Sequence, residues 1–171
     1  MNKIGGVMVT KTTQLLDLMG LRTLIATALN LPNERVREEF SKSLNDKTGF
    51  ITVAVLTDRQ IGREYKFTQN EGEIITSTRE ATISINAFGK NSLALIGKLN
   101  TLFYSSFFIQ SLKGKNLSLV SVSPIRNLTL GIGGASEERA NLDVVMSYNN
   151  RVEVSQNEIR KIDDIFIRKN R

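Results

Sequence analysis

The sequence predicts an α+β fold, a mainly antiparallel β-sheet of about six strands with two helices packed on one face. Apolar residues recur with the 3.6-residue period of a helix in two segments and with a period of two in most others. The segments follow one another in the order αβββαβββ. Because strands and helices do not alternate one by one, antiparallel pairing is favoured over a parallel sheet.

The length and composition are those of one globular domain. The chain has 171 residues, of which 40% are hydrophobic and 23% charged, and a domain of this size buries a sufficient core without disulfides or metals. No internal repeat or low-complexity linker divides it. We therefore expect a single domain over residues 1–171, with flexible termini at 1–11 and 169–171.

The first helix is predicted over Thr12 to Leu29. Thr12 or Thr13 can cap its start, and Asn30 and Pro32 mark its end, because proline cannot continue a helical hydrogen-bond ladder. Its apolar positions have helical spacing: Leu15, Leu18, Met19, Leu21, Leu24, Ile25, Ala28 and Leu29.

Strands dominate the next part of the chain. A short strand is expected near Arg35 to Phe40, and the polar stretch Ser43 to Gly49 is typical of a loop. Residues 50–67 are predicted to be extended, with a turn or bulge inside the stretch. After a turn at Gln69 to Gly72, the alternation over Glu73 to Phe88 predicts a long strand with one buried face.

A second helix is predicted after Gly89. Asn91 or Ser92 would cap it, and Lys113 with Gly114 would close it as last-turn cation and C-terminal glycine. Within it, core packing explains Phe103 and Phe107. Tyr104 and Phe108 can extend beyond the buried stripe as an exposed patch suited to a subunit interface, with packing in the core as the alternative.

The remaining pattern is again that of strands. Strands are expected over Leu117 to Ser123 and Glu138 to Asn149, separated by a loop from Pro124 to Ser136. A polar turn at Asn149 to Asn157 would then lead into a last strand, Ile159 to Arg168.

Composition argues against catalysis. The chain has no cysteine and no histidine, which excludes disulfides, thiolate metal sites and cysteine nucleophiles, and removes the commonest general base. We expect no enzymatic activity and no cofactor. The net charge of +6 is spread along the chain, with its densest basic stretch between Arg160 and Arg171.

The N-terminal segment does not have the pattern of a signal peptide. Gln14, Asp17 and Arg22 interrupt its apolar run, so neither a signal peptide nor a membrane span is expected. The sequence therefore favours a protein that is made and used in a cytoplasm, or built into a particle assembled there.

Two possible sites are explained more simply by structure. The glycines Gly131, Gly133 and Gly134 lack the lysine and following helix of a phosphate-binding loop, so we expect a mobile loop that serves a partner surface. A carboxylate metal site could draw on a scattered set of acids that solvated strand faces and turns explain as well: Asp143, Glu153, Glu158, Asp163 and Asp164.

Taken together, these elements resemble the phage neck terminator and tail terminator proteins. The similarity covers most of the chain. The segments that carry it are Ile83-Ser-Ile-Asn-Ala-Phe-Gly89, Ala94 to Leu102, Leu117 to Pro124, the pair Glu138-Arg139, Asn141 to Ser147 and Ile165-Phe-Ile167.

The resemblance implies a structural virion protein without catalytic activity. Such a protein forms a homohexameric ring at the head–tail junction, assembled in the host cytoplasm, and terminates or caps the tail. Its implied partners are further copies of itself, the head connector and the tail tube, with genome DNA passing through the ring without sequence-specific binding and with no membrane contact.

The resemblance does not allow any individual site residue to be assigned from the family. The loop 126–137 is the candidate contact with the next ring, and Glu138 with Arg139 the candidate for subunit pairing. The full candidate interface set is Arg126, Gly131, Gly133, Gly134, Glu137, Glu138, Arg139, Tyr104 and Phe108.

Three alternatives remain open from the sequence. The chain could be another virion part, such as a head-completion or tail-tube protein. It could instead be a basic nucleic-acid-binding regulator, for which Arg160 to Arg171 is the support, or a carboxylate metal enzyme.

Overall fold

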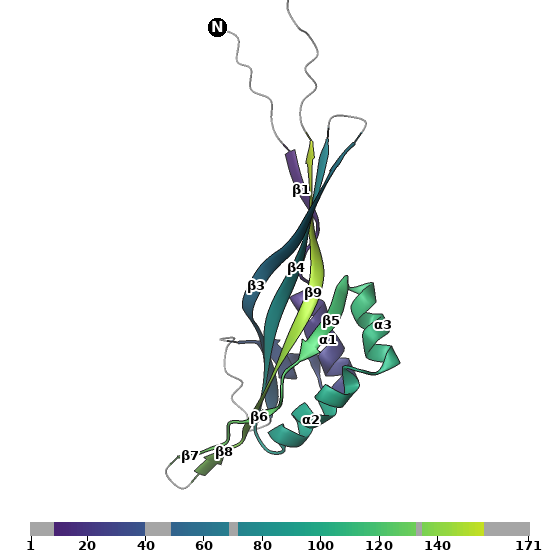
Figure 1. Cartoon of the computed structure of the whole chain (residues 1–171). Coiled ribbons are helices and arrows are strands. Elements are labelled where there is room, and N and C mark those ends of the chain that lie inside the picture. The colour runs from purple at the N-terminus through teal and green to yellow at the C-terminus, as the bar shows by residue number, and fades with distance from the viewer. Residues whose placement is uncertain (1–8, 40–48, 69–71, 133–134, 156–171) are drawn as a thin grey trace, which may run out of the picture.

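A computed structural model describes residues 9–39, 49–68, 72–132 and 135–155. One long curled sheet forms the body of the molecule, and the helices pack on one face of it (Figure 1). The helices are α1 (Leu18–Leu29), α2 (Ser92–Leu102) and α3 (Ser106–Gly114), with a 3-10 turn at Asn33–Arg35. The strands are β1 (Val9–Gln14), β2 (Val36–Glu38), β3 (Phe50–Phe67), β4 (Glu73–Phe88), β5 (Leu117–Val122), β6 (Arg126–Asn127), β7 (Leu130–Ile132), β8 (Ala135–Glu137) and β9 (Arg139–Ser155).

The predicted α+β class is confirmed, but the sheet has more strands than expected. Its strand order is β1-β9-β4-β3-β2, and β5 and β6 also pair with β9. All these pairs are antiparallel except β2 with β3, which is parallel. The described residues thus form a mixed sheet, with three helices where two were predicted.

Strands β4 and β9 form the centre of the sheet. They pair without a register shift from Glu73 opposite Val154 to Phe88 opposite Arg139. Their alternate side chains face the helices and are fully buried over half of the strand length: Ala81, Ile83, Ile85, Ala87, Ala140, Leu142, Val144 and Met146. The alternation predicted for Glu73 to Phe88 is therefore confirmed.

The predicted break in residues 50–67 is a bulge and not a turn. Strand β3 runs through the whole segment, but its pairing with β4 shifts between Val55 and Thr57 and again between Gln60 and Gly62. Bulges increase local twist, and the sheet curls in this region (Figure 1). The predicted strand near residue 36 is also confirmed as β2.

The first helix is shorter than predicted. It begins at Leu18, where the Asp17 side chain accepts a hydrogen bond from the Gly20 N–H at 2.8 Å, and it ends at Asn30 in the left-handed conformation (φ 57°). Residues 9–14 instead form β1 along β9. Their β-branched Val-Thr-Lys-Thr-Thr sequence suits a strand, so Val9 to Lys11 are not a flexible terminus as predicted.

The second predicted helix is two helices. Helices α2 and α3 are bent by 75° at the break between Leu102 and Ser106. The Ser105 hydroxyl accepts from the Phe108 N–H and donates to the Leu102 carbonyl oxygen, and serine competes in this way with regular helical bonds. No single described helix is long and apolar enough to cross a membrane, and the bent pair meets that test by length and composition only.

The break changes which aromatic rings are buried. Phe103 and Phe108 are both fully buried and meet edge to face, with ring centroids 4.8 Å apart. Tyr104 is 63% exposed and Phe107 is 56% exposed. The prediction of a buried Phe107 and the inclusion of Phe108 in the candidate interface set are therefore wrong, because a continuous helical period was assumed across the break.

The C-terminal part differs in two ways from the prediction. The loop expected from Pro124 to Ser136 contains β6 and the two-stranded hairpin β7–β8. The turn expected at Asn149 is absent, because β9 continues to Ser155 and pairs there with both β1 and β4. The predicted strand 159–168, the terminal residues 169–171 and most of the predicted loops at 43–49 and 69–72 lie outside the described residues.

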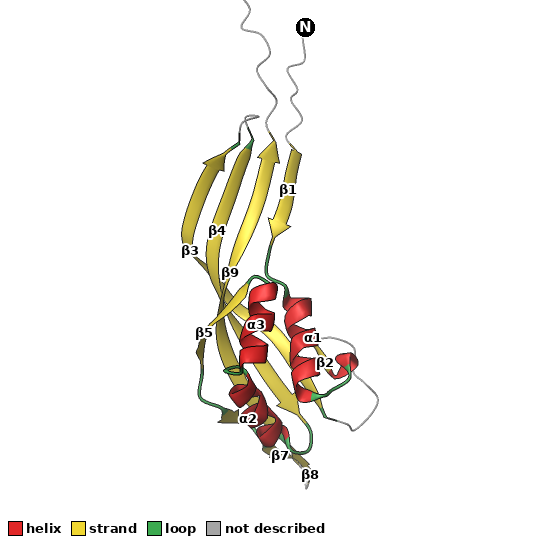
Figure 2. Ribbon diagram, turned by 90° about the vertical axis from the view of Figure 1, so that its right-hand side faces the viewer, coloured by secondary structure: helices red, strands yellow, loops and turns green. Residues whose placement is uncertain are grey.

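The helices cover only one end of the sheet (Figure 2). We call this end the helix-covered half. The other end, the helix-free half, consists of β1 with residues 59–67 of β3, 73–80 of β4 and 149–155 of β9. The hairpin β7–β8 lies at the opposite extreme of the molecule, beyond the start of α2 (Figure 1).

Replacing Phe108 with alanine tests the assignment of the core. The variant should lose about 3–5 kcal/mol of unfolding free energy, because a fully buried ring leaves a cavity. Phe107→Ala, its neighbour on α3, removes a largely exposed ring and should cost less than about 1 kcal/mol. Urea unfolding of both variants measures the difference, and equal losses would contradict this packing.

Candidate assembly surfaces

A polar cluster closes the core where the helix layer ends. The Tyr148 hydroxyl donates to Asp58 Oδ2 at 2.9 Å, and Arg79 Nε lies 3.0 Å from both carboxylate oxygens of Asp58. Burial, and then the hydrogen bond to Asp58, raise the pKa of Tyr148 above its usual value, and the same carboxylate raises the pKa of Arg79. The cluster joins β3, β4 and β9 at the boundary between the two halves of the sheet.

A second polar cluster lies on the sheet face opposite the helices. Asn141 Nδ2 donates to Ser84 Oγ at 2.8 Å and to Asn86 Oδ1 at 3.1 Å, and all three residues are buried. The Arg126 guanidinium donates to Asn141 Oδ1, at 2.6 Å from Nη2, and forms an ion pair with Asp143. Because Arg126 belongs to β6, this network fixes β6 to the centre of the sheet.

Glu138 and Arg139, the predicted subunit-pairing residues, have partners within their own subunit. The Glu138 carboxylate accepts from the Asn91 N–H at 2.7 Å, at the start of α2, and the Glu138 carbonyl oxygen accepts from Gly89 N–H at 2.9 Å. Arg139 Nη2 donates to Asn86 Oδ1 at 3.1 Å, and its guanidinium lies 4.9 Å from the Phe88 ring centroid. With Arg126, these residues anchor the base of the hairpin.

Gly89 makes the turn beside this anchor possible. Its φ is +92°, and a Cβ there would approach Gly49 Cα to 2.8 Å. Any other residue there would therefore clash with the backbone at Gly49, just before β3.

One exposed leucine lies on the hairpin β7–β8 and another lies at its base. Leu130 is 64% exposed and Leu128 is 38% exposed, and the Leu128 N–H donates to the Arg139 carbonyl oxygen at 2.8 Å. The Asn127 side chain accepts from both the backbone and the hydroxyl of Thr129. The segment thus presents apolar side chains on a support that is fixed at its base.

The glycines of the predicted loop belong to this hairpin. Gly131 lies in β7, where nothing stands within 4 Å of a Cβ position, while Gly133 and Gly134 lie outside the described residues. Strand β8, with Glu137 at its end, follows directly. Because the next described element is a strand and not a helix, this glycine cluster does not have the geometry of a phosphate-binding loop.

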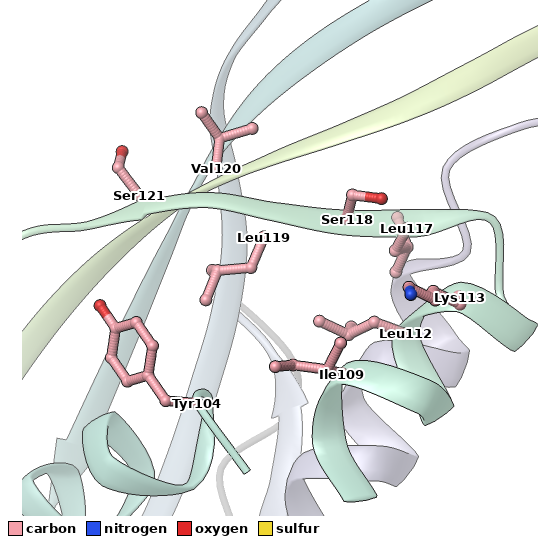
Figure 3. A pocket seen from close by; sticks show the side chains of 9 residues that line it. All are labelled: Tyr104, Ile109, Leu112, Lys113, Leu117, Ser118, Leu119, Val120 and Ser121. Carbon is pink, nitrogen blue, oxygen red and sulfur yellow. The ribbon is translucent and has the colours of Figure 1, made fainter. Parts of the chain in front are cut away.

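A groove separates α3 from the edge strand β5 (Figure 3). Its cavity measures about 320 Å³. Tyr104 stands at one end and Lys113 at the other, and Leu119 and Ile109 point into the space between them (Figure 3). Of the predicted aromatic patch, Tyr104 therefore lies at a surface groove, whereas Phe108 lies in the core.

The predicted acids do not form a metal site in the described part of the chain. No group of three or more acidic, histidine or cysteine side chains is placed to hold an ion there. Asp143 is paired with Arg126, and Glu153 lies in the helix-free half opposite Lys11. Glu158, Asp163 and Asp164 fall outside the described residues.

Comparison with known proteins identifies one family. The family model described as phage neck terminator protein matches residues 15–170, nearly the whole chain. A search of curated proteins finds no match.

Asn141→Ala tests the network that fixes β6. The variant should lose about 1–3 kcal/mol of unfolding free energy, because it removes the buried hydrogen bonds that Asn141 makes to Arg126, Ser84 and Asn86. Asn150→Ala on the same strand is the matched control. Its side-chain oxygen is buried without a partner, so its removal should cost clearly less in the same urea titration.

Tyr148→Phe tests the boundary cluster through pH. Because folding raises the pKa of Tyr148, the unfolded state releases its proton first, and the unfolding free energy should fall as pH rises above about 10. Chemical unfolding between pH 8 and 11 should show a shallower decline for Tyr148→Phe than for the parent chain. Identical slopes would contradict the raised pKa.

Proposed function

Because this chain belongs to the phage neck terminator protein family, we propose that it forms a homo-oligomeric ring, a hexamer, where the tail meets the head connector. Family membership makes it a structural protein of the head–tail junction that interacts with other head or tail proteins. The finer proposal is that the ring terminates or caps the tail, joins it to the connector and leaves a passage for the genome. It requires no catalytic step and no cofactor.

The shape of the sheet supports lateral association. The sheet has one edge formed by β1, β5 and β6 along β9 and an opposite edge formed by β3 with β2. When two different surfaces of one subunit meet repeatedly, the contact either closes into a ring or continues as a filament. A subunit with two different edges therefore suits the heterologous contact that a ring needs.

The hairpin supports axial contact. It projects at the end of the molecule opposite the helix-free half (Figure 1). Leu130 on the hairpin and Leu128 at its base are exposed. We assign Gly131, Gly133, Gly134 and Glu137 to this contact with the neighbouring connector or tail protein. The hairpin is held in place for this contact by three residues at its base: Arg126, Glu138 and Arg139.

The three helices and strands β2, β3, β4, β5 and β9 share one core, which supports treating the chain as one domain. Placement in the neck of the virion follows from the family, and assembly in the host cytoplasm is part of the proposal. The observation that carries the proposed function is the match over residues 15–170, combined with a subunit whose two sheet edges and projecting hairpin point in different directions.

The mass of the purified protein in solution tests the ring. We expect a closed ring of six subunits, or a monomer that forms this ring on tail tubes or connectors, seen by light scattering and negative-stain microscopy. A persistent monomer or dimer that ignores both partners and binds DNA would contradict the proposal and favour a nucleic-acid-binding role.

Leu130→Asp tests the axial contact separately. The variant should keep the parent ring mass but lose at least ten-fold in affinity for connectors or tail tubes, because it places a charge on an apolar contact. Thr129→Ser, a neighbouring change that keeps the hydroxyl at the hairpin base, is the control. Equal binding by Leu130→Asp and the parent would exclude the hairpin as the contact.

A further inference from the structure

Strand β5 is an edge strand without the usual protection. Its sequence, Leu-Ser-Leu-Val-Ser-Val, contains no charge and no proline, and no described strand pairs with its outer edge. Natural sheets protect free edges with charges, prolines or covering segments, because an open edge recruits further strands. An uncharged edge of this kind is suited to be covered by another strand.

The other edges of the same sheet are protected by charge. The outer part of β3 carries five charged residues: Asp58, Arg59, Arg63, Glu64 and Lys66. Strand β1 carries Lys11, and β6 carries Arg126. Among the described edge strands of more than three residues, β5 is therefore the one without a charged residue.

The groove beside β5 provides room for side chains of an added strand. Leu117, Leu119, Ile109 and Leu112 make its wall apolar, and Val120 on β5 is 51% exposed (Figure 3). Lys113 lies at one end (Figure 3). Chemically, the groove fits an extended apolar segment that carries a carboxylate beside it.

One segment of this chain has that chemistry. The sequence beyond β9 includes Asp163-Asp164-Ile165-Phe166-Ile167, two acids followed by three large apolar residues. The acids complement Lys113, and the apolar residues complement the groove. The segment is joined to Ser155, where β9 ends at the tip of the helix-free half (Figure 1).

Chain length favours a neighbouring subunit as the donor. Ser121 pairs with Val145, ten residues before Ser155 on β9, a distance of roughly 34 Å at about 3.4 Å per residue. A return from Ser155 that uses about three residues for the reversal brings Phe166 back by only about 26 Å at the extended limit. With the acids beside Lys113, Phe166 would lie near Ser121, so the subunit's own segment falls short in this register, and this limit does not apply to a neighbour.

We propose that the free edge of β5 and its groove bind residues 163–168 of a second copy of this chain as an added strand. This inference rests on the proposed ring, and it names the contact that joins adjacent subunits. Backbone hydrogen bonds along β5 supply affinity, while Lys113 and the apolar wall set the register.

Cysteine cross-linking tests the proposal, because the parent chain contains no cysteine. Ser121→Cys, with an affinity tag, is mixed with untagged Lys169→Cys, and the assembled mixture is treated with a short bismaleimide. We expect a tagged product of twice the 19.1 kDa subunit mass, at least ten-fold more abundant than in a control with Glu64→Cys on β3 replacing Ser121→Cys.

A second measurement uses the assembly itself. Replacing Ile165 and Ile167 with aspartate should raise the concentration needed for ring formation at least ten-fold while leaving the melting temperature of the monomer unchanged. The same double change made at exposed Thr23 and Thr27 of α1 controls for added charge.

The outcomes separate this inference from the proposed function. A ring that forms without the cross-link, or with a product equal to the Glu64→Cys control, overturns the inference and leaves the ring intact. A further variant carries both Ser121→Cys and Lys169→Cys in one chain. If its cross-link forms only within that chain and never between subunits, the inference is also overturned. If no ring forms with or without tail tubes and connectors, both proposals fail.

Discussion

The uninterrupted pairing of β4 with β9 is the constraint on which the rest of the structure depends. It holds one register from Glu73 to Phe88, and therefore assigns every alternate side chain of both strands to one face. Helices α1, α2 and α3 cover that face over the inner part, and the Asp58–Arg79–Tyr148 cluster closes it. On the opposite face, the same register places Asn141 opposite Asn86, and both residues belong to the network that holds β6.

Much of the fold could be predicted where local pattern and tertiary pairing agree. The strand over Glu73 to Phe88 was correctly bounded, because its apolar alternation coincides with the face that the helices cover. Prediction failed where a neighbouring strand, and not the local sequence, determines the conformation of the chain. The Asn149-Asn150-Arg151 stretch has turn-like composition, but β4 pairs with all three residues, and β1 pairs with Arg151 from the other side. The loop before β9 becomes a hairpin supported from its base.

The candidate surface was predicted less well than the fold. Sequence reasoning selected the segment around residues 126–139, which contains the projecting hairpin, but it could not show that Glu138 and Arg139 bond within the subunit. It kept Phe108 as a candidate interface residue because the break at Ser105 is set by a side-chain hydrogen bond and not by periodicity. The unprotected edge of β5 was missed, although the absence of charge in Leu117 to Val122 was a readable signal.

The length of the central strand pair also determines how the molecule carries mechanical load. Strands β4 and β9 run from the anchored base of the hairpin to the far end of the helix-free half (Figures 1 and 2). Their hydrogen bonds lie across the strand axis, so a pull directed along that axis shears them together and does not peel them apart one at a time. Tension applied at the hairpin is thereby shared along the whole subunit.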